Sequence, residues 1–263
     1  MNKQMYRHLC VNLTEDISDY IKSKMIYEHV RIIENILNEL LFLNKEIREK
    51  ELTIRIQYNK NGTIKNFILS NFEHRLKKLP PNFKNITVTN NLDLSNNEIN
   101  ELLEDFYKIN VGGNLDLSCN AIEKLPKYFA NIHIKGSLNL SRNKIIELPE
   151  NFGNLIHING NLNLSRNNIK ELPESFGNLI IEGDLDLHKN DLIKLKESFG
   201  NLIIGGSLSL VNNSLSKLPK NFIKITVQGE FNICFNVLNH NIPINSLRNI
   251  ILFKEWLKSY YCI

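Results

Sequence analysis

The sequence predicts an α/β-type solenoid, a right-handed coil with one parallel sheet, a β-rich convex side and helical caps at both ends. Three regularities predict it. A Leu-x-Leu segment recurs about every 23 residues, an Asn follows each copy, and a Phe recurs between copies. Self-similarity at a fixed period of this length indicates stacked repeats. The segments begin at Leu92, Leu115, Leu138, Leu162, Leu185, Leu208 and Phe231.

The Leu-x-Leu segment reads as a short strand because successive side chains of a strand point to opposite faces. Leu115 and Leu117 are therefore expected to point inward, and Asn114, Asp116 and Ser118 outward. Stacking the copies would place these strands side by side, about 4.8 Å apart, in a parallel sheet.

Two columns, sets of equivalent positions in successive repeats, are interpreted as structural. An Asn amide at the turn after each strand can satisfy backbone groups of its own coil and the next one. The Phe residues are expected to form a stacked aromatic spine. The Asn column is Asn97, Asn120, Asn143, Asn167, Asn190, Asn213 and Asn236. The Phe column is Phe83, Phe106, Phe129, Phe152, Phe176, Phe199 and Phe222.

An Ile-x-Ile/Val-x-Gly segment, such as 132–136, precedes each strand and predicts a second short strand that ends at a corner. The glycines there, including Gly113 and Gly136, are expected to supply a positive φ, and Asn90 replaces them in the first copy. The copy spanning 137–160 has one extra residue, which predicts a small bulge near Ile156.

The pattern LxLSxNxIxxLPxxFxNL resembles the leucine-rich repeat family over roughly residues 66–240, most closely its intracellular LPxxF type. The Ile-x-Ile-x-Gly variant departs from the common pattern and is similar to repeats of bacterial, phage and giant-virus proteins. With the abundance of Asn, Ile and Lys, it suggests a giant-virus origin. Strands on both sides of the coil would make it flatter and more β-helix-like than a horseshoe.

Three domains are expected. Residues 1–65 would form a helical N-terminal cap plus a β-hairpin, whose alternating strands flank an Asn-Gly turn. Residues 66–240 would hold about seven to eight repeats, and residues 241–263 a C-terminal capping helix with an apolar face over 246–261. A partner-binding role for that helix, and an F-box-like adaptor role for the N-terminal helices, are the functional alternatives to capping.

Composition and sequence pattern argue against a nucleic-acid-binding, secreted or membrane-spanning protein. A net charge of +4 over 263 residues, with Lys/Arg interspersed among Asp/Glu, leaves no footprint for a nucleic-acid surface. The four cysteines form no CxxC pair, and the first twenty residues lack the apolar core of a signal peptide. No apolar run is long enough for a membrane span. The protein is therefore expected in the cytoplasm, or in the host cytoplasm if it is viral.

No catalytic pattern emerges. The seven His residues show no metal-ligand spacing, and neither a phosphate-binding Gly-rich loop nor a GxSxG motif occurs. We therefore predict a protein that is not an enzyme and has no cofactor or metal. The adjacent Asp93 and Asp116 could instead hold Ca²⁺, but a solvated polar ladder is the simpler interpretation.

The leading hypothesis, by resemblance, is a protein–protein interaction module that binds a protein partner on the face of the parallel sheet. A basic stripe of Arg142, Arg166 and Lys189 is the best candidate contact for an acidic partner. The alternatives are a structural solenoid without a dedicated site and an adaptor acting through the N-terminal segment. The candidate partner-binding residues are Asp93, Ser95, Asp116, Ser118, Asn139, Ser141, Arg142, Asn163, Ser165, Arg166, Asp186, His188 and Lys189.

Overall fold

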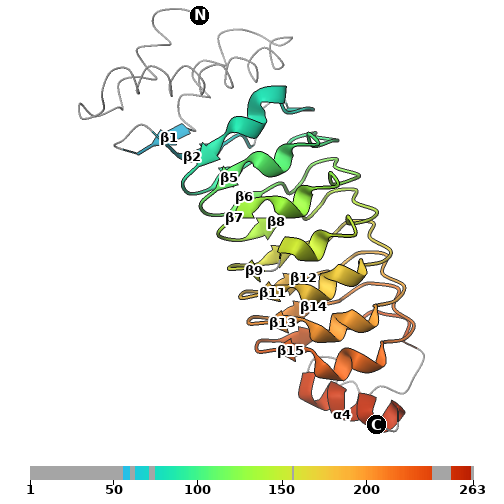
Figure 1. The fold of residues 1–263 in the computed structure, drawn as a ribbon. Helices are drawn as coiled ribbons and strands as arrows, with labels where there is room; N and C mark the ends of the chain where they lie inside the picture. The colour runs from blue at the N-terminus through green and yellow to red at the C-terminus, as the bar shows by residue number, and fades with distance from the viewer. Residues whose placement is uncertain (1–55, 60–62, 71–74, 156, 239–249, 262–263) are drawn as a thin grey trace, which may run out of the picture.

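The computed structural model describes residues 56–59, 63–70, 75–155, 157–238 and 250–261. Short coils stack one on the next in an open solenoid that runs from the β1–β2 hairpin to helix α4 (Figure 1). Each full coil contains two two-residue strands and one 3₁₀ helix. The predicted fold class is confirmed in these residues.

The Leu-x-Leu segments form the even-strand ladder, in which each strand pairs in parallel with those of the neighbouring coils. The register joins equivalent positions, such as Leu162 with Leu138 and with Leu185. Both apolar positions of each segment are buried, as the alternation predicts. The strands are β4 (Leu92–Asp93), β6 (Leu115–Asp116), β8 (Leu138–Asn139), β10 (Leu162–Asn163), β12 (Leu185–Asp186), β14 (Leu208–Ser209) and β16 (Phe231–Asn232).

The predicted second strands form the odd-strand ladder, which continues around a corner into the even-strand ladder. Strand β2 spans this corner, because it pairs with β3 at Ile64 and with β4 at Phe67 and Ile68. The odd-strand ladder is interrupted between β7 and β9, in the coil that has the extra residue; Ile156 itself lies outside the described residues. The strands are β3 (Thr87–Val88), β5 (Asn110–Val111), β7 (His133–Ile134), β9 (His157–Ile158), β11 (Ile180–Ile181), β13 (Ile203–Ile204) and β15 (Thr226–Val227).

The LPxxF segments form 3₁₀ helices, and their Phe rings create the aromatic spine predicted from the sequence. Successive rings stack at centroid distances such as 6.4 Å for Phe83–Phe106 and 6.3 Å for Phe176–Phe199. All seven rings are buried. The helices are η1 (Pro81–Asn85), η2 (Phe106–Lys108), η3 (Phe129–Asn131), η4 (Phe152–Leu155), η5 (Glu174–Asn178), η6 (Glu197–Asn201) and η7 (Lys220–Lys224).

The Asn column is a ladder that connects coils, as predicted. Asn143 donates from Nδ2 to the carbonyl of Leu140 at 3.1 Å in its own coil and to that of Leu117 at 3.0 Å in the preceding coil. Its Oδ1 accepts from the backbone N–H of Ile122 at 3.1 Å. Inter-coil contacts with the following coil were predicted; those of Asn143 are instead made with the preceding coil.

The corner glycines correct one prediction. Neither Gly113 nor Gly136 has a left-handed backbone, with φ between +20° and +160°, and Asn90 has no positive φ. A Cβ at Gly136 would lie 2.3 Å from Asn114 Oδ1 and 2.8 Å from the carbonyl carbon of Gly113. Glycine is present because successive coils approach closely at this corner, and not because the backbone is left-handed.

Both ends of the described solenoid are covered. Strand β1 (Ile56–Tyr58) pairs antiparallel with β2 (Ile64–Ile68), so the predicted hairpin leads directly into the stack. Helix α4 (Ile250–Tyr261) lies at the other end, where the Phe253 ring contacts Phe222 and Phe231. The C-terminal capping helix is confirmed, whereas the predicted N-terminal helices lie outside the described residues.

Candidate functional site

The even-strand face was predicted to carry the partner site, and most of its polar columns prove to be occupied by backbone contacts. The column of Asp93, Asp116, Asn139, Asn163 and Asp186 is half-buried. Its Oδ1 atoms accept from the backbone N–H two residues on, for example 2.8 Å from Ser118 to Asp116 and 3.0 Å from Ser165 to Asn163. These side chains therefore shape the turn after the strand.

The Ser column corrects the expected exposure. Ser95, Ser118, Ser141 and Ser165 were expected to face outward, but they are buried, with relative exposures of 2–8%. The turn begins one residue earlier than the strand alternation implies, so these hydroxyls lie beneath it. His188 replaces Ser in this column and is half-buried, with Nδ1 2.8 Å from Asp186 Oδ1.

The column that precedes the first Leu is structural too. Asn114 Oδ1 accepts from the backbone N–H of Ser137 at 2.8 Å, and Ser137 Oγ accepts from that of Asn161 at 2.9 Å. The same contact recurs from coil to coil around the corner, as between Asp184 and Ser207 at 2.7 Å. The polar identity of these residues is explained by this second side-chain ladder.

One column of this face remains free for function, and its unusual backbone was not evident from the sequence. The residue immediately before each ladder Asn has a left-handed conformation, with φ between 53° and 59°. Only Asn among its members tolerates that region well. We name this set the left-handed column: Asn96, Cys119, Arg142, Arg166, Lys189, Asn212 and Phe235.

The basic stripe, Arg142, Arg166 and Lys189, forms the centre of the left-handed column. All three side chains are exposed, and within the described residues none takes part in an ion pair. They belong to three successive coils with one backbone conformation, so their Cα atoms recur about every 4.8 Å. The identical turns therefore project three cations from one edge of the sheet.

Two further cations lie close to the basic stripe along the chain. Lys144 and Lys170 are exposed on the segment that follows the Asn ladder, and neither forms an ion pair within the part of the chain described. Both lysines lie outside the strand motif from which the candidate residues were predicted. Asp191, exposed near Lys189, is the opposing charge of this segment.

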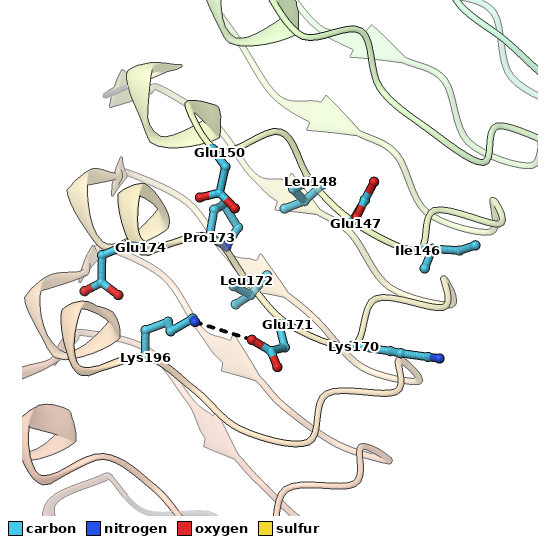
Figure 2. A pocket seen from close by; sticks show the side chains of 10 residues that line it. All are labelled: Ile146, Glu147, Leu148, Glu150, Lys170, Glu171, Leu172, Pro173, Glu174 and Lys196. Carbon is cyan, nitrogen blue, oxygen red and sulfur yellow. Dashed lines mark ion pairs between the residues drawn. The ribbon is translucent and has the colours of Figure 1, made fainter.

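The Leu-Pro side of the same coils is electrostatically different, because several of its charges form ion pairs. Glu171 lies 3.0 Å from Lys194 and 3.4 Å from Lys196, and these contacts, Lys194 first, hold the pKa of its carboxyl below the ordinary range. Figure 2 shows the Glu171–Lys196 pair beside a pocket of about 390 Å³, and Lys170 pointing away from that pair. Four glutamates line the pocket: Glu147, Glu150, Glu171 and Glu174.

Among the described residues, no group of three or more His, Cys, Asp or Glu side chains could hold a metal ion. The carboxylates considered for Ca²⁺ are engaged in hydrogen bonds. Asp93 Oδ2 accepts from Ser70 Oγ at 2.8 Å, and Asp116 Oδ2 accepts from Asn139 Nδ2 at 3.1 Å. A helix long and apolar enough to cross a membrane is also missing from the described part.

No protein-family model matches the chain, and a search of curated proteins finds no match. A search of solved structures finds distant similarity to leucine-rich repeat proteins. A leucine-rich repeat protein of Leptospira interrogans is 21% identical over 70% of this chain and 58% of its own, with a TM-score of 0.35. YopM, a leucine-rich effector of Yersinia pestis, is 20% identical over 65% of this chain and 55% of its own, with a TM-score of 0.39.

Drosophila Toll, solved in complex with Spatzle, is 18% identical over 73% of this chain and 33% of its own, with a TM-score of 0.38. The chain thus spans about half or less of the length of these structures. At such identities the likeness concerns the fold alone. The leucine-rich repeat architecture itself is established by the ladders, the Asn contacts and the Phe stack described above.

Proposed function

We propose that the protein is a non-enzymatic binding scaffold that holds an acidic segment of a partner protein along the basic stripe. The observation that carries this proposal is the set of three exposed cations on successive coils, without ion pairs among the described residues. The remaining polar columns of the even-strand face are used by the backbone. The residues with freedom to recognise a partner are therefore those of the left-handed column.

The chemistry of the stripe favours carboxylates. Arg presents a planar fork that matches a carboxylate with two hydrogen bonds, and Lys adds a point charge. A row of like charges without counter-charges attracts an oppositely charged segment and speeds its association, more strongly at low salt. An extended or helical acidic segment can place side chains at intervals comparable to the spacing of the coils.

Charge reversal tests the proposal. The triple variant Arg142→Glu, Arg166→Glu, Lys189→Glu keeps long, unbranched side chains at the left-handed positions, so the turns should persist. We expect its affinity for a fluorescent oligoglutamate peptide to fall at least tenfold, measured by anisotropy at low salt. The matched control is Lys77→Glu, Lys135→Glu, Lys220→Glu, which changes the net charge equally at exposed positions elsewhere.

The control should bind the peptide with no more than about a twofold loss, because its charges lie outside the stripe. Equal loss in both triple variants would show a general charge effect and would contradict a site on the stripe. Absence of peptide binding by the natural chain would favour the structural solenoid. Binding that disappears only when residues 1–50 are deleted would favour the adaptor hypothesis.

A further inference from the structure

The edge that carries the basic stripe becomes apolar at the last described coil, where exposed apolar side chains occupy the same columns. Phe235 occupies the left-handed column two coils beyond Lys189, and its side chain is 73% exposed. Val237, in the column of Lys144, is 61% exposed. Asn212 and Ser214 separate the basic and apolar parts.

The exposure of Phe235 is unusual for this molecule. The other described Phe rings are buried in the spine or at its two ends. Phe235 is instead held in the left-handed region, a conformation that is costly for an aromatic residue. Aromatic residues and Arg are also the residue types enriched at the energetic centres of interfaces. A hydrophobic anchor beside a cationic row is therefore built into one edge.

We infer that this edge is a two-part site for an extended acidic peptide segment that carries one apolar side chain beyond its acidic residues. The inference rests on the proposed function and adds the apolar anchor. Charge complementarity selects the acidic part, and the exposed Phe235 and Val237 select the apolar part. The shared turn geometry places both parts along one line parallel to the solenoid axis.

The coil spacing sets the length of the segment. Arg142 to Lys189 spans two coil steps, about 10 Å, and Lys189 to Phe235 spans two more. An extended chain advances about 3.3 Å per residue. The acidic residues should therefore lie within about four consecutive positions, and the apolar residue about three positions further on. A peptide of about seven residues covers the whole edge.

The test uses the complete chain and synthetic heptapeptides whose three glutamates lie within the first four positions. One peptide ends in leucine and its partner in serine, and a second pair has the reversed order, so that both chain directions are sampled. In one direction, leucine should raise the affinity about tenfold over serine, since burial of an apolar side chain contributes that much. Fluorescence anisotropy gives the dissociation constants.

Phe235→Asn with Val237→Ser is the diagnostic variant, because Asn suits the left-handed conformation and the coil should be preserved. We expect it to remove the advantage of leucine and to leave the affinity for the serine peptide unchanged. The stripe reversal should weaken both peptides. Sedimentation at the same concentrations should show one mass, and self-association through this edge would overturn the inference.

The two ideas fail differently. If leucine and serine peptides bind equally, or if the Phe235 variant keeps the leucine advantage, the two-part site is wrong while an acidic-segment scaffold stands. If neither peptide binds the natural chain, both are wrong. If the leucine peptides bind and the stripe reversal has no effect, the apolar end acts without the stripe, and the inference is overturned.

Discussion

Two columns that are neighbours in the sequence behave in opposite ways. Asn143 is buried and forms two hydrogen bonds to the preceding coil and one to the carbonyl of Leu140 in its own coil, whereas Arg142, one residue earlier, is exposed and unconstrained by side-chain contacts of that kind. The same holds for Arg166 beside Asn167. Identity is invariant in the buried column and varies freely in the exposed one.

The difference shows how a repeat separates folding from recognition within a single turn. The ladder Asn satisfies the backbone groups that the turn leaves unpaired. The residue that precedes this Asn lies in the left-handed region in every one of these coils, whatever its side chain is. Seven different coils therefore share one backbone while presenting Asn, Cys, Arg, Lys or Phe.

The substitution Asn167→Ala, in the buried column, is expected to have the largest effect on stability. It leaves the N–H of Ile145 without its partner and removes one of the two Asn donors from each of the carbonyls of Leu140 and Leu164, which keep Asn143 and Asn190. The buried N–H left unpaired costs about 1–3 kcal/mol and each other lost hydrogen bond about 0.5–1.5 kcal/mol, so we expect a loss of about 3 kcal/mol in the free energy of unfolding, measured with urea. Arg166→Ala is the matched control and should change stability by less than about 0.5 kcal/mol. Similar losses in both variants would contradict the division of roles.

A second change tests the backbone of the exposed column. Arg166→Val places a β-branched residue at φ 56°, and we expect a destabilisation of about 1–2 kcal/mol although the site is exposed. Arg166→Asn should instead stabilise the protein by about 0.5 kcal/mol, because Asn tolerates this region. Thermal and urea unfolding of both variants give the sign. An equal response would mean that this turn is not left-handed in solution.

The smallest expected effect extends the comparison to charges, since within the described residues the stripe forms no ion pair whereas several other cations do. Lys84 lies 2.7 Å from Asp105, and this hydrogen bond and charge hold the pKa of Asp105 below its ordinary value of 3.8. A lowered carboxylate pKa stabilises the protein above pH 3.8, and this contribution is lost as the pH falls through the folded value. Lys84→Ala should raise the pKa of Asp105, measured by NMR titration. The free energy of unfolding that is lost as the pH falls should then be smaller by a few tenths of a kcal/mol, because the pair is largely solvated. An unchanged pKa would show that the pair does not persist in solution.

The core was predictable because each of its columns has a chemical signature that repeats. Alternating Leu, the ladder Asn and the stacked Phe need no long-range information, since each coil meets only equivalent positions of its neighbours. The C-terminal helix was predictable from its apolar face. The N-terminal helices, the domain boundaries and the partner-binding roles of the candidate residues remain predictions.

The left-handed column was not predictable, because Arg, Lys, Cys and Phe carry no local preference for a positive φ. Asn96 and Asn212 were the available hint, but Asn is abundant throughout the chain. The prediction for the glycines was wrong for a different reason: Gly is permitted a positive φ, yet glycine is needed at Gly136 because the preceding coil lies so close. The predicted exposure of the Ser column was wrong because the alternation of strand side chains was extended one residue too far, into the turn.

The Phe spine has a consequence for how such a molecule could change over generations. Every interior coil offers its neighbours the same ring, the same amide and the same strand, so a coil can be duplicated or lost without redesign of the core. Each such event between Lys189 and Phe235 would shift the cationic and apolar ends of the edge by about 4.8 Å. Repeat number would then act as a ruler, setting which peptide lengths fit while the chemistry at each end stays the same.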